Sequence, residues 1–211
     1  MDAIVTQLIE KIKAWSPHDG PDHWDDATFD ALARELFARQ FERNAPYRAL
    51  CEGRGVRPHP ALTARELPAV PTDAFKHVRL SCAPAPQRVF LTSGTTQGVR
   101  GAHAIGDLDV YRASLRAPFI RYMLPEAQPM RMLMLTPSDA DMPESSLSFM
   151  LGELSRELGG AGSQFLVQRA TPEAPLTFSL DQLADALDDA VARDTPVAIL
   201  GTAFALVELC D

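Results

Sequence analysis

Apolar side chains recur every three or four residues in two segments near the beginning of the chain, as they do on one face of an amphipathic helix. The first stripe comprises Ile4, Val5, Leu8, Ile9 and Ile12, and the second comprises Phe29, Leu32, Ala33, Leu36 and Phe37. Between them lies a stretch rich in Pro, Asp and His, which indicates a loop. Asp25 or Asp26 is expected to cap the second helix.

From Arg88 onward, short apolar runs alternate with helical periodicity. Strands are predicted at 88–91, 130–135, 164–167 and 197–200, and helices at 107–124, 147–158, 180–192 and from 202 onward. This alternation is typical of the α/β class, with a parallel sheet covered by helices. Residues 52–87 contain many prolines and are expected to be irregular. We therefore predict a helical and Pro-rich segment over 1–87, which packs on an α/β core over 88–211 within one incomplete domain.

Composition narrows the functional classes. Hydrophobic residues make up 46% of the 211 residues, which is ordinary for a globular protein, and no apolar run is long enough for a membrane helix. The three cysteines, Cys51, Cys82 and Cys210, form no disulfide or metal motif, which favours a reducing cytoplasm. The net charge of -8 argues against broad nucleic-acid or anionic-membrane binding, whereas ATP needs only local positive potential.

The segment from Thr92 to Gly98, with the sequence TSGTTQG, carries the clearest chemical signal. Its hydroxyl residues are Thr92, Ser93, Thr95 and Thr96, and its glycines are Gly94 and Gly98. Glycine lets successive backbone N–H groups point inward and form an anion-binding nest, and Arg100 adds a planar cation. The segment follows a predicted strand, so we expect it at the carboxyl edge of the parallel sheet. Ordinary loop composition is the alternative, but the position favours a phosphate-binding loop.

This segment resembles the phosphate-binding motif of the adenylate-forming superfamily, except that Gln97 replaces a glycine and Val99-Arg100 replaces Pro-Lys. Five further segments resemble the acyl-protein synthetase (LuxE) family, which is related to phenylacetate-CoA ligases. They are the segment 67–76 with its Phe75-Lys76, residues 100–103, the segments 135–137 and 145–147, and residues 201–206.

The resemblance implies that ATP and Mg²⁺ activate a fatty or other carboxylic acid as its acyl-adenylate. The acyl group then passes to an enzyme cysteine and on to a partner protein such as a reductase or carrier, or alternatively to coenzyme A. It also implies that residues 92–98 bind ATP and that Arg100 is catalytic. Gly201, Thr202, Phe204 and His103 would border the substrate pocket, and no metal ligands are assigned.

Several of these residues have ordinary alternatives. Thr202 can begin a helix with Phe204 in the core, and His103 can be a solvated loop residue. Ser145 and Ser146 are expected to cap the next helix. Cys210 is expected to be a small buried residue rather than the acyl acceptor. His18 and His23 are expected in a solvated loop rather than at a metal site.

The later motifs of the superfamily are missing from the sequence. They include a Thr-Glu pair for Mg²⁺, an aspartate for the ribose and a C-terminal catalytic lysine. We therefore expect an N-terminal part of such an enzyme, inactive alone and prone to self-association through 197–200 and 204–209. A partner-binding or scaffold module without catalysis is the alternative from another class.

Overall fold

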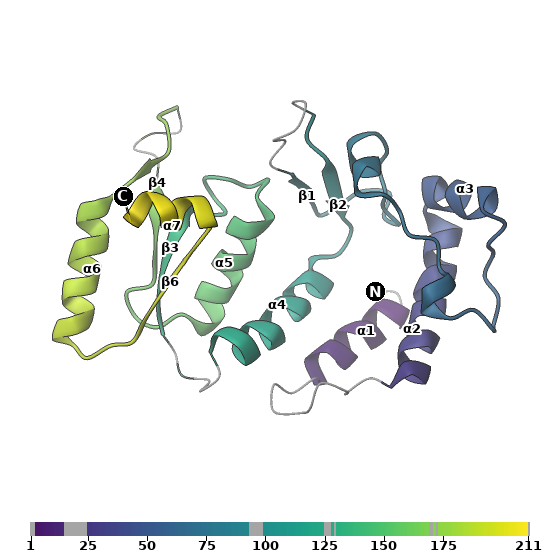
Figure 1. Cartoon of the computed structure of the whole chain (residues 1–211), viewed down its shortest axis with the longest axis horizontal. Helices are drawn as coiled ribbons and strands as arrows, with labels where there is room; N and C mark the ends of the chain where they lie inside the picture. The colour runs from purple at the N-terminus through teal and green to yellow at the C-terminus, as the bar shows by residue number, and fades with distance from the viewer. Residues whose placement is uncertain are drawn as a thin grey trace. The chain divides into compact units, whose positions relative to one another are not determined.

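The computed structural model describes residues 3–14, 25–92, 99–124, 128, 130–168, 171 and 173–210, without the side chains of Glu208 and Cys210. The chain forms two compact units, Met1–Pro125 and Glu126–Asp211, shown in Figure 1. The division falls after Pro125 rather than after residue 87, because the segment 88–124 packs with the N-terminal helices. No helix within the described ranges is both long and apolar enough to cross a membrane.

Four helices form most of unit 1: α1 (Ala3–Ala14), α2 (Asp26–Arg43), α3 (Ala45–Gly53) and α4 (Leu108–Met123). The predicted apolar stripe of α1 is confirmed, because Ile4 and Ile9 are buried together with Ala113 of α4. In α2, Leu32 and Phe37 are buried as predicted, whereas Phe29 is 50% exposed. The predicted cap is also confirmed, since Asp25 accepts a hydrogen bond from the Thr28 backbone N–H at 2.6 Å. The sequence did not predict α3.

The Pro-rich segment contains two short 3-10 helices, η1 (Ala64–Glu66) and η2 (Thr72–Lys76). Apolar residues of this segment, among them Leu62 and Val70, pack on a buried cluster of Phe37, Tyr47 and Cys51. It therefore covers α2 and α3, and through Phe75 it also contacts His103 further along the chain. The proline-rich stretch supplies apolar side chains without the regular backbone bonds of a helix or ladder.

A two-stranded hairpin completes unit 1. Strand β1 (Arg88–Leu91) pairs antiparallel with β2 (Ala102–Ile105), in a register that sets Leu91 opposite Ala102. Phe90 is buried and meets the ring of Tyr111 on α4 edge to face, with centroids 5.7 Å apart.

Unit 2 is a four-stranded sheet in the order β5-β4-β3-β6, and three of its strands are parallel. The strands are β3 (Arg131–Pro137), β4 (Gln164–Gln168), β5 (Thr177–Phe178) and β6 (Val197–Gly201). Helices α5 (Ser146–Leu158), α6 (Leu180–Ala192) and α7 (Ala203–Cys210) follow the three parallel strands. The predicted mixed α/β architecture is therefore present, with its parallel sheet confined to unit 2.

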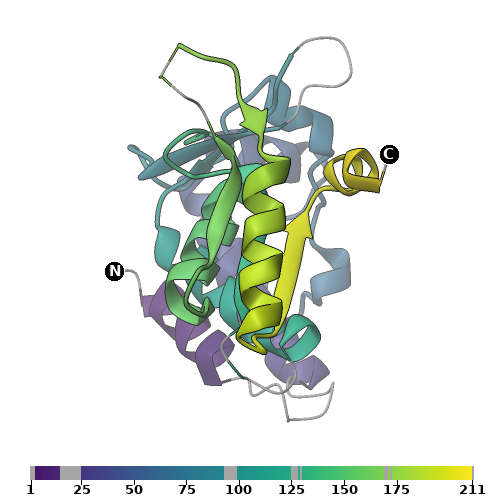
Figure 2. The same ribbon diagram turned by 90° about the vertical axis from the view of Figure 1, so that its left-hand side faces the viewer.

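Helices cover both faces of this sheet, as Figures 1 and 2 show for α5 and α6. Leu133 and Leu135 of β3 are buried against α6, with Ala205 and Leu209 of α7 packed on the same cluster. Met132 and Met134 alternate with them along β3 and are also buried.

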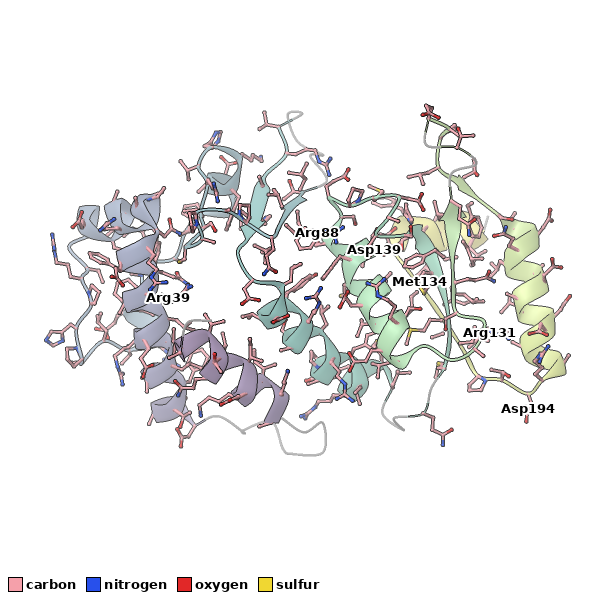
Figure 3. The ribbon with its side chains drawn as sticks, turned by 180° about the vertical axis from the view of Figure 1, so that it is seen from behind. Arg39, Arg88, Arg131, Met134, Asp139 and Asp194 are labelled. Atoms are coloured by element: carbon pink, nitrogen blue, oxygen red, sulfur yellow. The ribbon has the colours of Figure 1, made fainter. Side chains whose placement is uncertain are left out.

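Arg131 lies at the beginning of β3, and Figure 3 labels it together with Met134. Its guanidinium donates to the Ala161 and Ala186 carbonyls and binds the Asp189 carboxylate of α6 at 2.7 Å.

Candidate functional site

The ends of the segment 92–101 are held together by three hydrogen bonds. The Thr92 N–H donates to the Gly101 carbonyl, and the Gly101 N–H donates to Thr92 Oγ1, both at 2.9 Å. Arg100 Nε donates to the Thr92 carbonyl at 2.7 Å. This bond fixes the Arg100 guanidinium where the two ends of the loop meet, and we call these paired ends, Thr92 with Arg100 and Gly101, the neck of the loop. The remaining predicted phosphate-binding residues, Ser93–Gly98, lie outside the described residues.

The structure corrects the expected setting of this loop. β1 pairs with β2 and not with the parallel sheet, so Thr92 follows a strand of an antiparallel hairpin. The prediction that the loop lies at the carboxyl edge of the parallel sheet is therefore wrong. No strand was predicted at Ala102–Ile105, which is only four residues long and contains two alanines, a residue with low strand propensity.

Residues distant in the sequence meet at the base of this loop. The Phe75 ring of η2 lies 4.2 Å from the ring of His103 on β2, with the two planes tilted by 31°. A Cβ on Gly101 would lie 3.3 Å from Thr92 Cγ2 and 3.5 Å from Phe75 Cβ, so glycine permits this close packing. The two segments that carry the family resemblance, 72–76 and 100–103, are therefore neighbours.

Basic side chains surround a cavity of about 380 Å³ beside the hairpin. Its lining includes Lys76, His77 and Arg79 of the η2 region together with Ala102 of β2. Lys76 Nζ lies 2.9 Å from one oxygen of Asp73, and His77 Nε2 lies 3.1 Å from the other. These hydrogen bonds lower the pKa of Asp73. The base of the loop therefore lies in a locally basic region of a protein with an acidic net charge.

A second candidate site lies at the carboxyl ends of β3 and β6 in unit 2. These two strands are adjacent, and Leu135 pairs with Gly201. The chain leaves β3 toward α5 on one face of the sheet and leaves β6 toward α7 on the other face. Neighbouring parallel strands whose connections diverge in this way leave a crevice, which is where open α/β sheets bind ligands.

Thr136 supports this second site. It is 5% exposed, and its Oγ1 has no hydrogen-bond partner among the described residues. A buried hydroxyl without a partner is unfavourable, and native proteins satisfy most such groups with protein, water or ligand. The sequence identified the segment 135–137 by resemblance alone and assigned Thr136 no role.

The predicted pocket residues Gly201 and Thr202 lie beside Thr136. A Cβ on Gly201 would lie 2.9 Å from Leu135 Cβ, so this close approach requires glycine. Thr202 Oγ1 accepts a hydrogen bond from the Ala205 N–H at 3.2 Å, which confirms its capping role for α7. Phe204 is 84% exposed, so the alternative that it packs in the core is wrong. His103 belongs to unit 1 and lies in a strand rather than a loop.

The remaining candidate residues either have structural roles or belong to parts of the chain that the structure does not describe. Ser145 caps α5 by accepting a hydrogen bond from the Ser148 N–H at 3.1 Å, and Ser146 is the first residue of that helix. His18, His23 and the Cys210 side chain are not among the described parts. Within those parts, no group of three His, Cys, Asp or Glu side chains is placed to hold a metal ion.

Comparisons with models of known protein families, with curated proteins and with solved structures gave no match. The case for a function therefore comes from this chain's own residues and geometry.

Proposed function

We propose that this chain belongs to an enzyme that uses MgATP to activate a carboxylic acid. One carboxylate oxygen attacks the α-phosphorus of ATP, pyrophosphate leaves, and an acyl-adenylate forms. A thiolate then attacks the acyl carbonyl, a thioester forms, and AMP leaves. Such a reaction requires donors and cations that stabilise charge on the phosphoryl oxygens.

The neck of the 92–101 loop is the observation that carries this proposal. Three hydrogen bonds between Thr92 and Arg100-Gly101 hold together the ends of a segment rich in Ser, Thr and Gly. Lys76 and Arg79 lie around the adjoining cavity. A segment rich in Ser, Thr and Gly whose two ends are joined beside several cations suits an anion as highly charged as a triphosphate. Carboxylates are fewer than basic side chains in this region, and one of them, Asp73, is bound to Lys76.

The carboxyl ends of β3 and β6 provide separate support. Thr136 offers an unpaired hydroxyl there, and the exposed ring of Phe204 follows on α7. A hydroxyl donor and an aromatic surface suit a ligand that has both polar and apolar parts.

Substitution of Thr92 tests the proposal. Thr92→Val removes the oxygen that accepts from the Gly101 N–H, whereas Thr92→Ser retains it. Loss of one such bond corresponds to about 1 kcal/mol, or roughly a fivefold effect. In a longer product of the same gene that catalyses acid-dependent pyrophosphate exchange, we expect Thr92→Val to slow the exchange by about that factor or more, with Thr92→Ser close to the wild type. Equal rates for both variants would contradict the role of the neck.

The acyl acceptor is either a protein thiol or coenzyme A. We favour a protein thiol because of the resemblance of segments 67–76 and 201–206 to the acyl-protein synthetases. Radiolabelled acid distinguishes the two acceptors: label that stays with protein after denaturation supports a protein thioester, and release of acyl-CoA supports the alternative.

A partner-binding module is the second candidate function. Its supporting observation is the exposed apolar surface of β6 and α7, where Phe204 is 84% and Val207 58% exposed. Soluble monomers rarely expose such side chains side by side without a binding role.

A further inference from the structure

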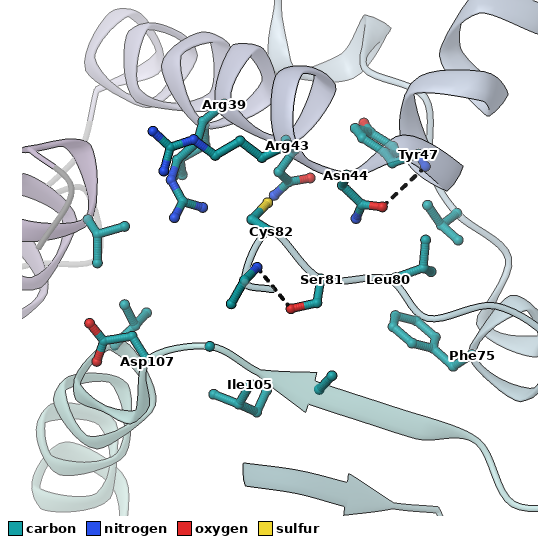
Figure 4. A pocket seen from close by; sticks show the side chains of 18 residues that line it. Arg39, Arg43, Asn44, Tyr47, Phe75, Leu80, Ser81, Cys82, Ile105 and Asp107 are labelled. Atoms are coloured by element: carbon teal, nitrogen blue, oxygen red, sulfur yellow. Dashed lines mark hydrogen bonds between the residues drawn. The ribbon is translucent and has the colours of Figure 1, made fainter. Parts of the chain in front are cut away.

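A cavity of about 640 Å³ lies in unit 1, bordered by α2, residues 80–83 and the connection from β2 to α4 (Figure 4). Its volume is within the range of roughly 300–1,000 Å³ that is usual for small-molecule sites. It is separate from the cavity beside the loop, although Phe75 and Ala104 line both.

Two arginines on α2 give this cavity a basic wall. Arg39 and Arg43 lie one helical turn apart, and Figure 4 shows both side chains on the cavity side of α2. Guanidinium groups bind carboxylate or phosphate oxygens in a bidentate manner.

Neutral donors and a single carboxylate complete the polar part of the lining. Asn44 is buried, and its Oδ1 caps α3 by accepting from the Tyr47 N–H at 3.3 Å. Its Nδ2 is the other branch of the planar amide and points away from this bond (Figure 4). Asp107 is the one carboxylate among the described lining residues, and its Oδ1 caps α4 through the Asp109 N–H at 2.8 Å. The lining therefore carries more positive than negative charge, although the whole chain carries -8.

Apolar side chains from several elements also line the cavity. Leu36 of α2, Leu80, Ile105 and Val110 of α4 line it together with Val70. A free inorganic ion would leave this surface in contact with water. A ligand with an anionic group and a hydrocarbon part matches both kinds of surface.

We propose that this cavity binds a small amphipathic carboxylate, with its carboxylate on Arg39 and Arg43 and its hydrocarbon part against Leu36, Leu80 and Ile105. The site is independent of the proposed adenylation reaction. Each can fail without the other, because the test uses no ATP.

Calorimetric titration of the chain with octanoate tests the proposal, with octanamide as the uncharged match and inorganic phosphate as the anion without a hydrocarbon part. Charge-assisted hydrogen bonds to an arginine predict that Arg43→Gln weakens octanoate binding by about tenfold or more. Arg57→Gln is the control variant, because Arg57 pairs with Glu52 at 3.0 Å and does not line the cavity.

Cys82 gives a second readout inside the cavity. Its side chain points toward α2 in Figure 4 and is partly exposed, whereas Cys51 is buried. Bound octanoate is expected to slow alkylation of Cys82, measured on its own peptide by mass spectrometry. This protection should disappear in Arg43→Gln at the same octanoate concentration.

The proposal would be supported if octanoate binds at one site and protects Cys82. Arg43→Gln should weaken this binding, and Arg57→Gln should leave it unchanged. Three results would overturn the proposal: no octanoate binding, equally tight binding of octanamide, or equally tight binding of phosphate. Binding that leaves Cys82 unprotected would also overturn it, because the ligand would then lie elsewhere.

Discussion

At the scale of single residues, Thr136 gives the clearest sign of a ligand site in unit 2. Its hydroxyl is buried at the carboxyl end of β3 without a partner among the described residues. A threonine retained only for stability would pair its hydroxyl, since an unsatisfied buried hydroxyl costs about 1–3 kcal/mol.

Thr136→Val therefore should not destabilise the protein. The substitution keeps the shape and removes the unpaired oxygen, so we expect the free energy of unfolding to stay the same or rise by about 1 kcal/mol. Urea unfolding followed by circular dichroism measures it. Thr202→Val is the control, and it should lower stability by about 1 kcal/mol because it removes the cap of α7. A Thr136→Val protein less stable than Thr202→Val would show that the hydroxyl has a structural partner.

Tyr47 allows a prediction about pH. It is 7% exposed, its hydroxyl donates to the Pro68 carbonyl at 3.0 Å, and burial raises its pKa to about 12. Folding therefore favours the neutral phenol relative to the unfolded chain, where the pKa is about 10. This contribution to stability is fully present below about pH 10 and is lost as the pH rises toward about 12.

Ultraviolet absorbance follows the ionisation of the three tyrosines directly. We expect an ionisation step at a pH above that of a free tyrosine, and Tyr47→Phe to remove that step. A step at high pH that remains in Tyr47→Phe would contradict the assignment.

Residue-scale features were predictable where they depend on neighbours in the sequence. The caps at Asp25, Ser145 and Thr202 follow from a short polar side chain just before an apolar periodic run. Neither the lack of a partner at Thr136 nor the Phe75–His103 stack could be predicted in this way. Both depend on which distant segments pack together.

At the scale of elements, the length of an apolar run decided what the sequence could predict. β3, β4 and β6 were predicted because each contains a run of apolar residues between helices with strong periodicity. β2 and β5 were missed, since they have only four and two residues and pair antiparallel. Without β2, nothing in the sequence indicated that β1 belongs to a hairpin.

Arg131 tests how β3 and α6 are held together. Its buried guanidinium binds the Ala161 and Ala186 carbonyls and the Asp189 carboxylate. Arg131→Met leaves these acceptors without their donor, so we expect a loss of about 2–4 kcal/mol in the free energy of unfolding. Arg193→Gln is the matched control, because Arg193 binds the same Asp189 from an exposed position and should have a much smaller effect. Similar losses in both variants would contradict the anchoring role of Arg131.

At the scale of the whole molecule, the exposed apolar surface of unit 2 agrees with an expectation from the sequence. β6 is at the end of the strand order, and Ile199, Phe204 and Val207 are exposed on or after it. A parallel edge strand next to apolar side chains favours pairing with another chain.

We therefore expect the chain to self-associate, with a light-scattering mass that rises with protein concentration. Phe204→Ser with Val207→Ser should lower that mass without reducing helical content, because both side chains are already exposed. Val191→Ser is the control, since Val191 is exposed on α6. A wild-type mass equal to one chain at all concentrations would contradict this expectation.

The most direct test of the proposed function is acid-dependent exchange of labelled pyrophosphate into ATP. It should be measured on this chain and on any longer product of the same gene, with a panel of fatty and aromatic acids. The proposal predicts that a longer product exchanges pyrophosphate only with Mg²⁺ and a carboxylic acid, and that Thr95→Ala with Thr96→Ala slows the exchange strongly. The chain alone should show little exchange. Robust exchange by the chain alone would contradict its interpretation as part of a larger site, and exchange unaffected by the double substitution would contradict the phosphate-binding loop.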